Sequence, residues 1–129
     1  MGTTQQTWEA KQEMKFLIFN GSLKPDAESN TFKVCKMAQL AFEKMGHECE
    51  VITMRDLDYE GSTSDVNDEL KPHIMKMFKA DGVIFATPIW WGNHSCHIQA
   101  MLERLDVIYS WAKDNKHQPF YNKVFGTLV

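Results

Sequence analysis

The chain has 129 residues, of which 43% are hydrophobic and 24% are charged, and a formal net charge of −3 at pH 7. This composition is typical of a single globular domain and argues against disorder and against a second domain. The weak negative charge excludes a general attraction to nucleic acid or anionic membrane, and no apolar run approaches the roughly 20 residues that span a bilayer.

Residues 1–14 are mostly polar and predict a flexible tail or a short helix. They lack the apolar core of a signal peptide. Three cysteines, Cys35, Cys49 and Cys96, are widely spaced and odd in number, which argues against a disulfide or zinc framework. Reduced thiols are typical of a cytoplasmic protein, so we expect a cytoplasmic location.

The first predicted element is a strand over residues 15–20, which has almost no polar interruption, as in a central parallel strand. Gly21 ends this strand. After a loop, the residues Ser29-Asn30-Thr31 offer caps for a helix N-terminus, and the spacing of apolar residues predicts a helix over residues 31–45. Gly46 is suited to the left-handed conformation that stops such a helix.

A second strand is predicted over residues 48–54, and its polar content favours a place near the edge of the sheet. A loop over residues 55–65 follows. The next helix is expected to start near Pro72, which suits a first turn, or to consist of two pieces that meet there. The acidic side chains of this region are predicted to be solvated rather than to form a cation site; they are Asp56, Asp58, Asp65 and Asp68.

The run Gly82-Val83-Ile84-Phe85-Ala86 predicts a buried third strand, which Thr87-Pro88 ends because proline cannot donate to a ladder. The clearest helical period of the chain follows over residues 96–113. A polar linker over residues 114–122 leads to a fourth strand over residues 123–129. Strands that alternate with helices in this way predict a doubly wound α/β domain with a parallel sheet and right-handed crossovers.

Two loops are expected to lie at the carboxyl edge of that sheet, where ligands bind in open α/β folds. The first, from Gly21-Ser22-Leu23-Lys24 to Ser29-Asn30-Thr31, combines a tight turn, a lysine, hydroxyl groups and a helix N-terminus, which suits a phosphate. It lacks the endings of a nucleoside-triphosphate loop and of a three-glycine dinucleotide loop. The alternative is an ordinary capped helix start without a ligand.

The second loop, Thr87-Pro88-Ile89-Trp90-Trp91-Gly92-Asn93-His94-Ser95, carries two adjacent indoles. They indicate either the wall of a slot for a flat ligand or aromatic residues of the core or an interface, and at least one indole is expected near the surface. His94 and His97 have no third ligand of suitable spacing, so they are predicted to be solvated or helix-capping rather than a metal pair. Cys96 is expected to be a structural thiol at the helix start.

These loops resemble those of the flavodoxin-like NADPH-dependent FMN reductase family. The family has Gly-Ser-Leu/Pro-Arg with a Ser/Gly-Asn-Thr ending, where this chain has Gly21-Ser22-Leu23-Lys24 and Ser29-Asn30-Thr31. Its second motif is Ala-Asp, an apolar strand and Thr-Pro-Val/Ile-Tyr-Trp-Gly, matched by residues 80–93, and Glu103-Arg104-Leu105-Asp106 stands where the family helix ends near Asp-Arg. The resemblance covers residues 15–129 and implies a flavodoxin-like sheet with strand order 2-1-3-4.

The resemblance implies FMN as the cofactor. It implies that the phosphate is held by Ser22, Lys24, Asn30 and Thr31, with Ser29 as a helper. It implies that the isoalloxazine is lined by Pro88, Ile89, Trp90, Trp91, Gly92 and Asn93, with the backbone N–H groups of Gly92 and Asn93 at the polar edge of the ring. Lys24 keeps the charge of the usual arginine but loses its planar fork.

The implied activity is hydride transfer from NAD(P)H to the flavin, followed by electron delivery to a quinone, azo, metal or protein acceptor. No catalytic side chain is expected, because this chemistry belongs to the cofactor. One alternative is a flavodoxin-like electron carrier that binds FMN. Another is a truncated domain that acts in protein association without flavin.

The family continues past the fourth strand with a further ligand-contacting loop, a fifth strand and more helices, so we expect the domain at 15–129 to be incomplete at its C-terminal end. Crossover handedness puts the first helix alone on one face of the sheet and the later two on the other. Because an uncovered apolar face is a liability, we expect residues 1–14, another subunit or a longer chain to cover it. The resemblance also implies a homodimer and a small-molecule acceptor, with no nucleic acid or membrane partner.

Overall fold

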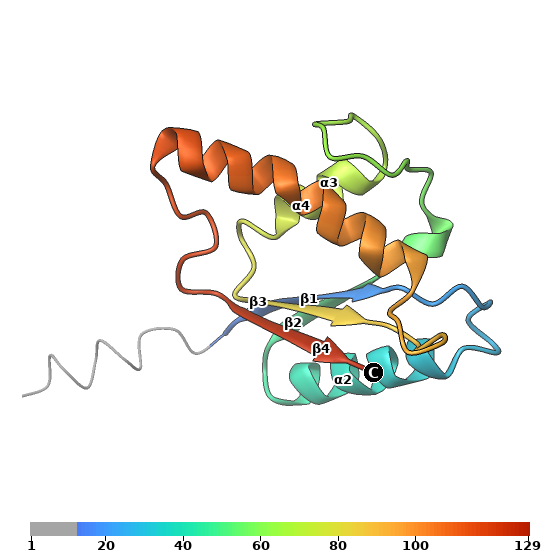
Figure 1. Ribbon diagram of the computed structural model, residues 1–129. Helices are drawn as coiled ribbons and strands as arrows, with labels where there is room; N and C mark the ends of the chain where they lie inside the picture. The colour runs from blue at the N-terminus through green and yellow to red at the C-terminus, as the bar shows by residue number, and fades with distance from the viewer. Residues whose placement is uncertain (1–12) are drawn as a thin grey trace, which may run out of the picture.

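A computed structural model describes residues 13–129, so nearly all of the segment predicted as a tail or short helix, residues 1–14, lies outside the described residues. The elements follow in the order β1 (Lys15–Asn20), α2 (Asn30–Lys44), β2 (Glu48–Thr53), η1 (Met54–Asp56), α3 (Leu70–Lys76), β3 (Gly82–Ala86), α4 (Cys96–Asn115) and β4 (Val124–Leu128) (Figure 1). The short 3-10 helix η1 was not predicted; the other elements correspond to predicted ones. Within residues 13–129, every helix is too short or too polar to cross a bilayer.

The strands form one parallel sheet in the order β2-β1-β3-β4, which confirms the predicted fold class and strand order. In β1, Ile18 pairs with Val51 of β2 on one side and with Ile84 of β3 on the other. Residues 17–20 of β1 are all buried, as expected for a central strand covered on both faces. The more polar β2 lies at the edge, as predicted.

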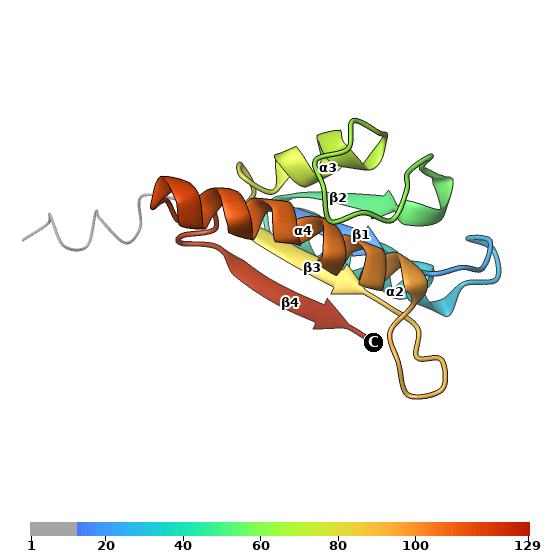
Figure 2. The same cartoon turned by 45° about the horizontal axis from the view of Figure 1, so that its top comes forward.

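Helix α2 covers one face of the sheet, and α3 and α4 cover the other (Figures 1 and 2). Successive strand residues point to opposite faces, so the sheet supplies two separate cores. Phe19 and Val83 belong to the core beneath α3 and α4, whereas Ile18 and Ala86 pack with Cys35 of α2. This arrangement confirms the distribution of helices predicted from crossover handedness.

Helix α2 exposes apolar side chains along one flank. Val34, Met37 and Met45 are 40%, 68% and 67% exposed, and Val124 of the neighbouring β4 is 72% exposed. This is the surface expected of a helix that, among residues 13–129, lies alone on its face of the sheet. Its cover by residues 1–14, by another subunit or by a longer chain stays a prediction.

The ends of the long helices follow from local capping chemistry. The Oγ of Ser29 accepts a hydrogen bond from the N–H of Phe32 at 2.9 Å, and the Oγ of Ser95 accepts one from the N–H of Ile98 at 3.3 Å. Gly46, with φ of 87°, follows the C-terminus of α2 in the left-handed conformation that was predicted for it.

A buried ion pair ties the loop between β2 and α3 to α4, which contradicts the prediction that Asp68 is solvated. The side chains of Arg104 and Asp68 are 3% and 12% exposed, and they meet through two bonds, Nη1 to Oδ2 at 2.7 Å and Nη2 to Oδ1 at 3.0 Å. Arg104 also donates to the carbonyl groups of Glu60 and Val66. The other three acidic residues of this region, Asp56, Asp58 and Asp65, are exposed as predicted.

Asp68 also sets the start of α3. Its Oδ1 accepts hydrogen bonds from the N–H groups of Leu70 and Lys71, both at 3.2 Å. Pro72 is the third residue of the helix, inside the first turn, where its missing N–H leaves no intrahelical bond unmade. The alternative of two helical pieces that meet at Pro72 is therefore wrong.

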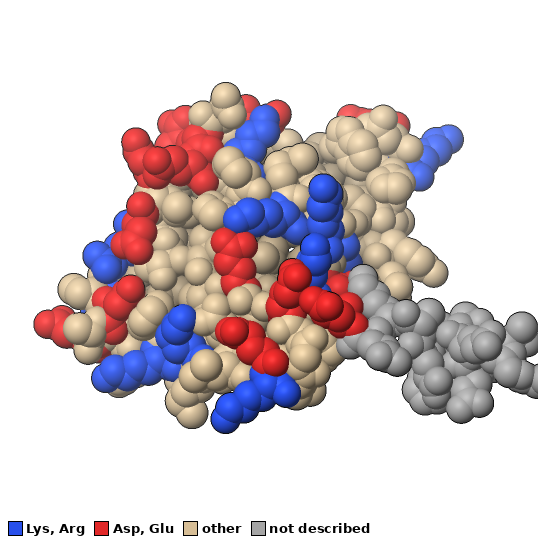
Figure 3. Space-filling model, turned by 180° about the vertical axis from the view of Figure 1, so that it is seen from behind, with Lys and Arg blue, Asp and Glu red and all other residues tan. Residues whose placement is uncertain are grey.

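The surface carries both signs of charge. Figure 3 shows Lys and Arg side chains interspersed with Asp and Glu side chains on the face seen from behind. Ion pairs among the described residues join Lys76 to Glu50 at 3.0 Å and Lys15 to Glu48 at 3.9 Å. A mixed surface of this kind agrees with the weak net charge and produces no field of a single sign.

Candidate functional site

The two loops singled out in the sequence meet at the carboxyl ends of β1 and β3. The N–H of Gly21 donates to the carbonyl of Ala86 at 2.8 Å, so the first loop leaves the sheet beside the second. The ammonium group of Lys24 lies 5.9 Å from the ring centroid of Trp90. Lys24 of the first loop thus lies over the indole of Trp90 in the second loop, which is a cation–π arrangement.

Gly21 allows this close approach. A Cβ at this position would lie 2.5 Å from Cγ1 of Ile98 and 2.7 Å from Oγ of Ser95, distances that a real side chain does not adopt. The first loop is therefore pressed against the start of α4. The absence of a side chain at Gly21 fixes the spacing between the two loops.

The first loop is held by its own buried hydroxyl groups. Ser22 and Ser29 are both buried, and the Oγ of Ser29 donates to the Oγ of Ser22 at 2.8 Å. The N–H of Ser22 donates to Oδ1 of Asn20 at 3.1 Å, and the N–H of Lys24 donates to Oγ of Ser22 at 3.3 Å. Ser29 also caps α2, so these two serines shape the loop.

The N-terminus of α2 keeps donors for a ligand. The first helical hydrogen bond runs from the N–H of Lys33 to the carbonyl of Ser29 at 3.2 Å, so the N–H groups of Asn30 and Thr31 precede the helical ladder. Asn30 is exposed and Thr31 is partly buried. Free N–H groups at the positive end of a helix dipole, with Lys24 exposed nearby, suit an anionic group.

The second loop is closed at its base by Thr87. The Oγ1 of Thr87 accepts a hydrogen bond from the N–H of Ser95 at 2.8 Å and donates to the carbonyl of Pro88 at 2.8 Å. Both ends of the loop are thereby fixed beside the end of β3. Ile89 is 51% exposed and Trp90 is 46% exposed on the resulting projection.

The tip of this loop is a tight turn with an unusual residue in it. The backbone groups of Trp90 and Asn93 exchange two hydrogen bonds, each of 2.9 Å, and the two residues between them, Trp91 and Gly92, have φ of 51° and 79°. Two positive φ angles define a type I′ turn, which favours Asn, Asp or Gly at both positions. Trp91 therefore adopts a costly backbone conformation, and its side chain is 98% exposed.

This turn corrects one expectation. The N–H of Asn93 is donated to the carbonyl of Trp90, so in this conformation it is engaged inside the turn and does not face a ligand. Of the predicted aromatic pair, Trp90 lies beside the first loop through Lys24, whereas Trp91 projects into solvent.

Replacing Trp91 with asparagine is expected to raise the free energy of unfolding by about 1 kcal/mol, because asparagine adopts a positive φ at lower cost. For a domain of this size the gain corresponds to a rise in Tm of about 4 °C, which differential scanning calorimetry measures. The control is Trp91→Phe, which keeps a bulky side chain at the same φ and is expected to melt like the wild type. Equal melting of the two variants would show that the backbone at this turn carries no strain.

A third segment, after β2, reaches the start of α4 and was missed in the sequence. The hydroxyl of Tyr59 is hydrogen-bonded to Nδ1 of His97, so this partly buried histidine has a side-chain partner that was not predicted. Burial raises the pKa of Tyr59 to about 12, and burial together with the nearby Arg55 lowers the pKa of His97. Both groups are therefore uncharged near neutral pH. No local signal in the sequence connects residues so far apart.

The remaining predictions about this edge have mixed outcomes. His94 is exposed and hydrogen-bonded to the side chain of Gln99. Cys96, at the first position of α4, is exposed, so its thiol is not part of the packed core. In residues 13–129, no group of three or more His, Cys, Asp or Glu side chains is placed to hold a metal ion.

The chain is similar to known proteins in sequence and in structure. The chain is 30% identical to 8-demethyl-8-aminoriboflavin-5′-phosphate synthase of Streptomyces davaonensis, over 90% of this chain and 50% of that protein. It is 29% identical to an iron-sulfur flavoprotein of Archaeoglobus fulgidus, over 70% of this chain and 48% of that protein. A crystal structure of RosB with a bound 8-demethyl-8-formylriboflavin-5′-phosphate intermediate superposes with a TM-score of 0.74 at 28% identity, over 88% of this chain and 50% of that one.

The chain therefore spans about half the length of the curated relatives that it matches. A model of the NADPH-dependent FMN reductases matches residues 14–129, which is nearly the whole chain. The matched region contains both loops at the carboxyl edge of the sheet. The chain belongs to the NADPH-dependent FMN reductase family.

Proposed function

We propose that this chain binds FMN across the two loops, with the phosphate at the N-terminus of α2 and the isoalloxazine along residues 88–93. The observation that carries the proposal is the position of Lys24. This residue belongs to the first loop, and its Nζ lies 5.9 Å from the ring centroid of Trp90 in the second loop. A ligand with an anionic tail and a flat ring matches the two neighbouring surfaces. In the proposal Lys24, Asn30 and Thr31 contact the phosphate, while Ser22 and Ser29 hold the loop in shape.

The residues present fit this group. The N–H groups at the start of α2 supply donors to the phosphate. In the same loop, Oδ1 of Asp26 is buried and has no hydrogen-bond partner among the described residues. A buried acceptor of this kind is costly unless a donor reaches it.

The ring would lie along Pro88, Ile89 and Trp90, with the type I′ turn at its outer end. Pro88 is partly buried and Ile89 and Trp90 are about half exposed, which leaves apolar surface for a flat ligand to cover. Trp91 and Gly92 stand at the tip of the turn. In the proposal the N–H of Gly92 reaches the polar edge of the ring.

We further propose that FMN, held by these residues, would supply redox chemistry between NAD(P)H as hydride donor and a quinone, azo, metal or protein acceptor. Such redox chemistry is supplied by the flavin, so the chain needs no side-chain acid or nucleophile. The residues of the chain bind the phosphate, orient the ring and shield one of its faces. Membership of the family supports this activity. A homodimer and a small-molecule acceptor remain part of the proposal, and sedimentation tests the dimer.

A titration tests the flavin site directly. FMN is expected to bind the chain at micromolar concentration, measured by quenching of flavin fluorescence. Lys24→Gln is expected to weaken FMN binding by about tenfold through loss of a charge-assisted contact, and to leave the binding of riboflavin, which has no phosphate, unchanged. Lys44→Gln is the matched control, because Lys44 is the last residue of α2, at the end opposite the loop that contains Lys24. Absence of FMN binding, or an equal loss of riboflavin binding in Lys24→Gln, would contradict the proposed site.

The activity is tested separately from the binding. The FMN-loaded chain is mixed anaerobically with NADPH or NADH, and the expected result is rapid loss of the yellow colour of oxidised flavin. If the chain binds FMN but the flavin keeps its yellow colour, the result would instead favour a flavodoxin-like electron carrier, which is one of the alternatives that the sequence left open. The two measurements distinguish a failed site from a failed reaction.

A further inference from the structure

We infer that the cavity between α3 and the C-terminal half of α4 binds a small amphiphilic molecule with a flat aromatic body and one anionic head. The cavity has a volume of about 490 Å³, which lies within the range of small-molecule sites, roughly 300–1,000 Å³. All of its lining residues lie between positions 64 and 119, and neither loop of the proposed flavin site contributes to it. This inference does not depend on the proposed function.

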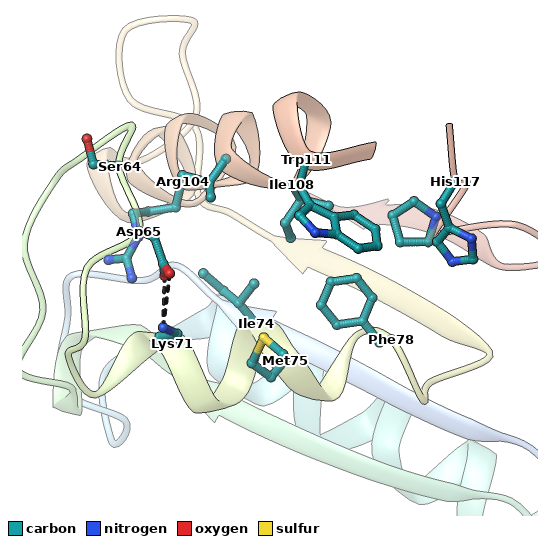
Figure 4. Close-up of a pocket in the computed structure, with 12 residues that line it drawn as sticks. Ser64, Asp65, Lys71, Ile74, Met75, Phe78, Arg104, Ile108, Trp111 and His117 are labelled. Atoms are coloured by element: carbon teal, nitrogen blue, oxygen red, sulfur yellow. Dashed lines mark hydrogen bonds and ion pairs between the residues drawn. The ribbon is translucent and has the colours of Figure 1, made fainter. Parts of the chain in front are cut away.

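Two aromatic side chains face one another at one end of the cavity, Phe78 from the turn that follows α3 and Trp111 from α4 (Figure 4). Each ring is held by a neighbour. Trp111 meets His117 edge to face, with ring centroids 5.6 Å apart, and Phe78 stacks on Phe120, with centroids 5.8 Å apart. Rings fixed in this way form a preorganised slot, which a flat aromatic body fills at low entropic cost.

The middle of the cavity is aliphatic and open to solvent. Ile74 and Ile108 are buried and form its inner wall, whereas Met75 is 52% exposed and Trp111 is 48% exposed at its mouth. Large apolar side chains that remain exposed around a hollow are characteristic of binding surfaces. Methionine also adapts its shape to an incoming ligand.

The polar end of the cavity determines the charge of the ligand. Lys71 and Asp65 form an ion pair of 3.0 Å there, with side chains 34% and 63% exposed. An exposed pair of this kind is weak, so a carboxylate on the ligand can take the place of Asp65, which is the more exposed partner. Arg104 offers no free charge, because Asp68 and two backbone carbonyls occupy its guanidinium group. The cavity therefore favours one anionic head, bound by Lys71.

The probe for this site is 2-naphthoate, a flat aromatic body with one carboxylate, compared with the neutral 2-naphthamide. Binding is followed through the indole N–H signals of the four tryptophans in a ¹H–¹⁵N spectrum. We expect 2-naphthoate to shift the signal that Trp111→Phe removes, and to leave the signals of Trp90 and Trp91 in place. Saturating FMN is expected not to displace it.

Matched variants test the two ends of the cavity. Trp111→Ala is expected to weaken 2-naphthoate binding by about tenfold, whereas Tyr109→Ala, which lies on the same helix outside the lining and is 67% exposed, is expected to leave it unchanged. Lys71→Gln is expected to weaken 2-naphthoate by about threefold and not to affect 2-naphthamide. Lys79→Gln, a nearby exposed lysine outside the lining, is the charge control.

Several results would overturn the inference. These are absence of binding at millimolar 2-naphthoate, shifts at Trp90 or Trp91 in place of Trp111, and equal losses in Trp111→Ala and Tyr109→Ala. If the chain self-associates and Trp111→Ala abolishes this association, the inference would also be overturned, since a second copy of the chain would then occupy the cavity. A correctly folded Trp111→Ala variant is established beforehand by circular dichroism.

Discussion

Replacing Arg104 with methionine is expected to lower the free energy of unfolding by about 3–5 kcal/mol, the cost typical of leaving a buried charge without its partner. In the wild type the side chains of Arg104 and Asp68 are 3% and 12% exposed and joined by two hydrogen bonds. The variant keeps the length and apolar character of the arginine stem but leaves Asp68 with its carboxylate uncompensated. Urea unfolding at neutral pH measures the loss.

The loss is expected to depend on pH. The hydrogen bonds from Arg104 lower the pKa of Asp68 from 3.8 to about 2. A carboxyl group with a lowered folded-state pKa contributes stability above its ordinary pKa and loses it as the pH falls through the folded value. The difference in unfolding free energy between wild type and Arg104→Met is therefore expected to narrow as the pH falls from about 4 towards 2.

The exposed pair of Lys71 and Asp65 provides the control for this prediction. It lies in the same part of the molecule, with side chains 34% and 63% exposed, so Lys71→Met is expected to cost less than about 1 kcal/mol. Equal costs for Lys71→Met and Arg104→Met would show that burial of the ion pair is not the source of the stability. A gap between Arg104→Met and wild type that stays constant on acidification would show that Asp68 is not the group involved.

Gly21→Ala is the second substitution with a large expected effect, a loss of about 2–3 kcal/mol in the free energy of unfolding. The added Cβ would lie 2.5 Å from Cγ1 and 2.8 Å from Cδ1 of Ile98, so either the first loop or the start of α4 must move. Movement of either element separates the two loops of the proposed flavin site. FMN binding is therefore expected to weaken together with stability.

The clash can be isolated with Ile98. Shortening this residue in Ile98→Ala removes the two Ile98 atoms that the new Cβ meets and leaves only the Oγ of Ser95 at 2.7 Å. The double variant is therefore expected to be more stable than the sum of the two single losses predicts, by about 1 kcal/mol or more. Gly61→Ala is the matched control, because a Cβ there meets nothing within 4 Å, and it is expected to change stability by less than about 0.5 kcal/mol. Strict additivity of the Gly21 and Ile98 losses would show that no clash connects them.

The sequence by itself determined the elements and their order. Apolar runs and helical spacing are local, so β1, α2, β3 and α4 lie where the pattern predicts them, and Ser29 caps α2 through an Oγ three residues from its partner N–H. The order of strands and helices, with the handedness of crossovers, then fixed the face on which each helix lies. Both loops of the candidate site were located in the same way, since each directly follows a strand.

Only the tertiary structure decided which side chains meet across the chain. Arg104 pairs with Asp68 across 36 positions and Tyr59 with His97 across 38, and neither distance leaves a periodic or capping signal in the sequence. An acidic residue in a loop is usually solvated, because burial of an unpaired charge is costly. Asp68 is buried nevertheless, because Arg104 on α4 compensates its charge. The type I′ turn at Trp91 is equally hidden, because tryptophan is not a residue that such a turn favours. Local sequence carries the hydrogen-bonding periods of helices and strands, whereas these contacts exist only once the packed sheet has brought distant segments together.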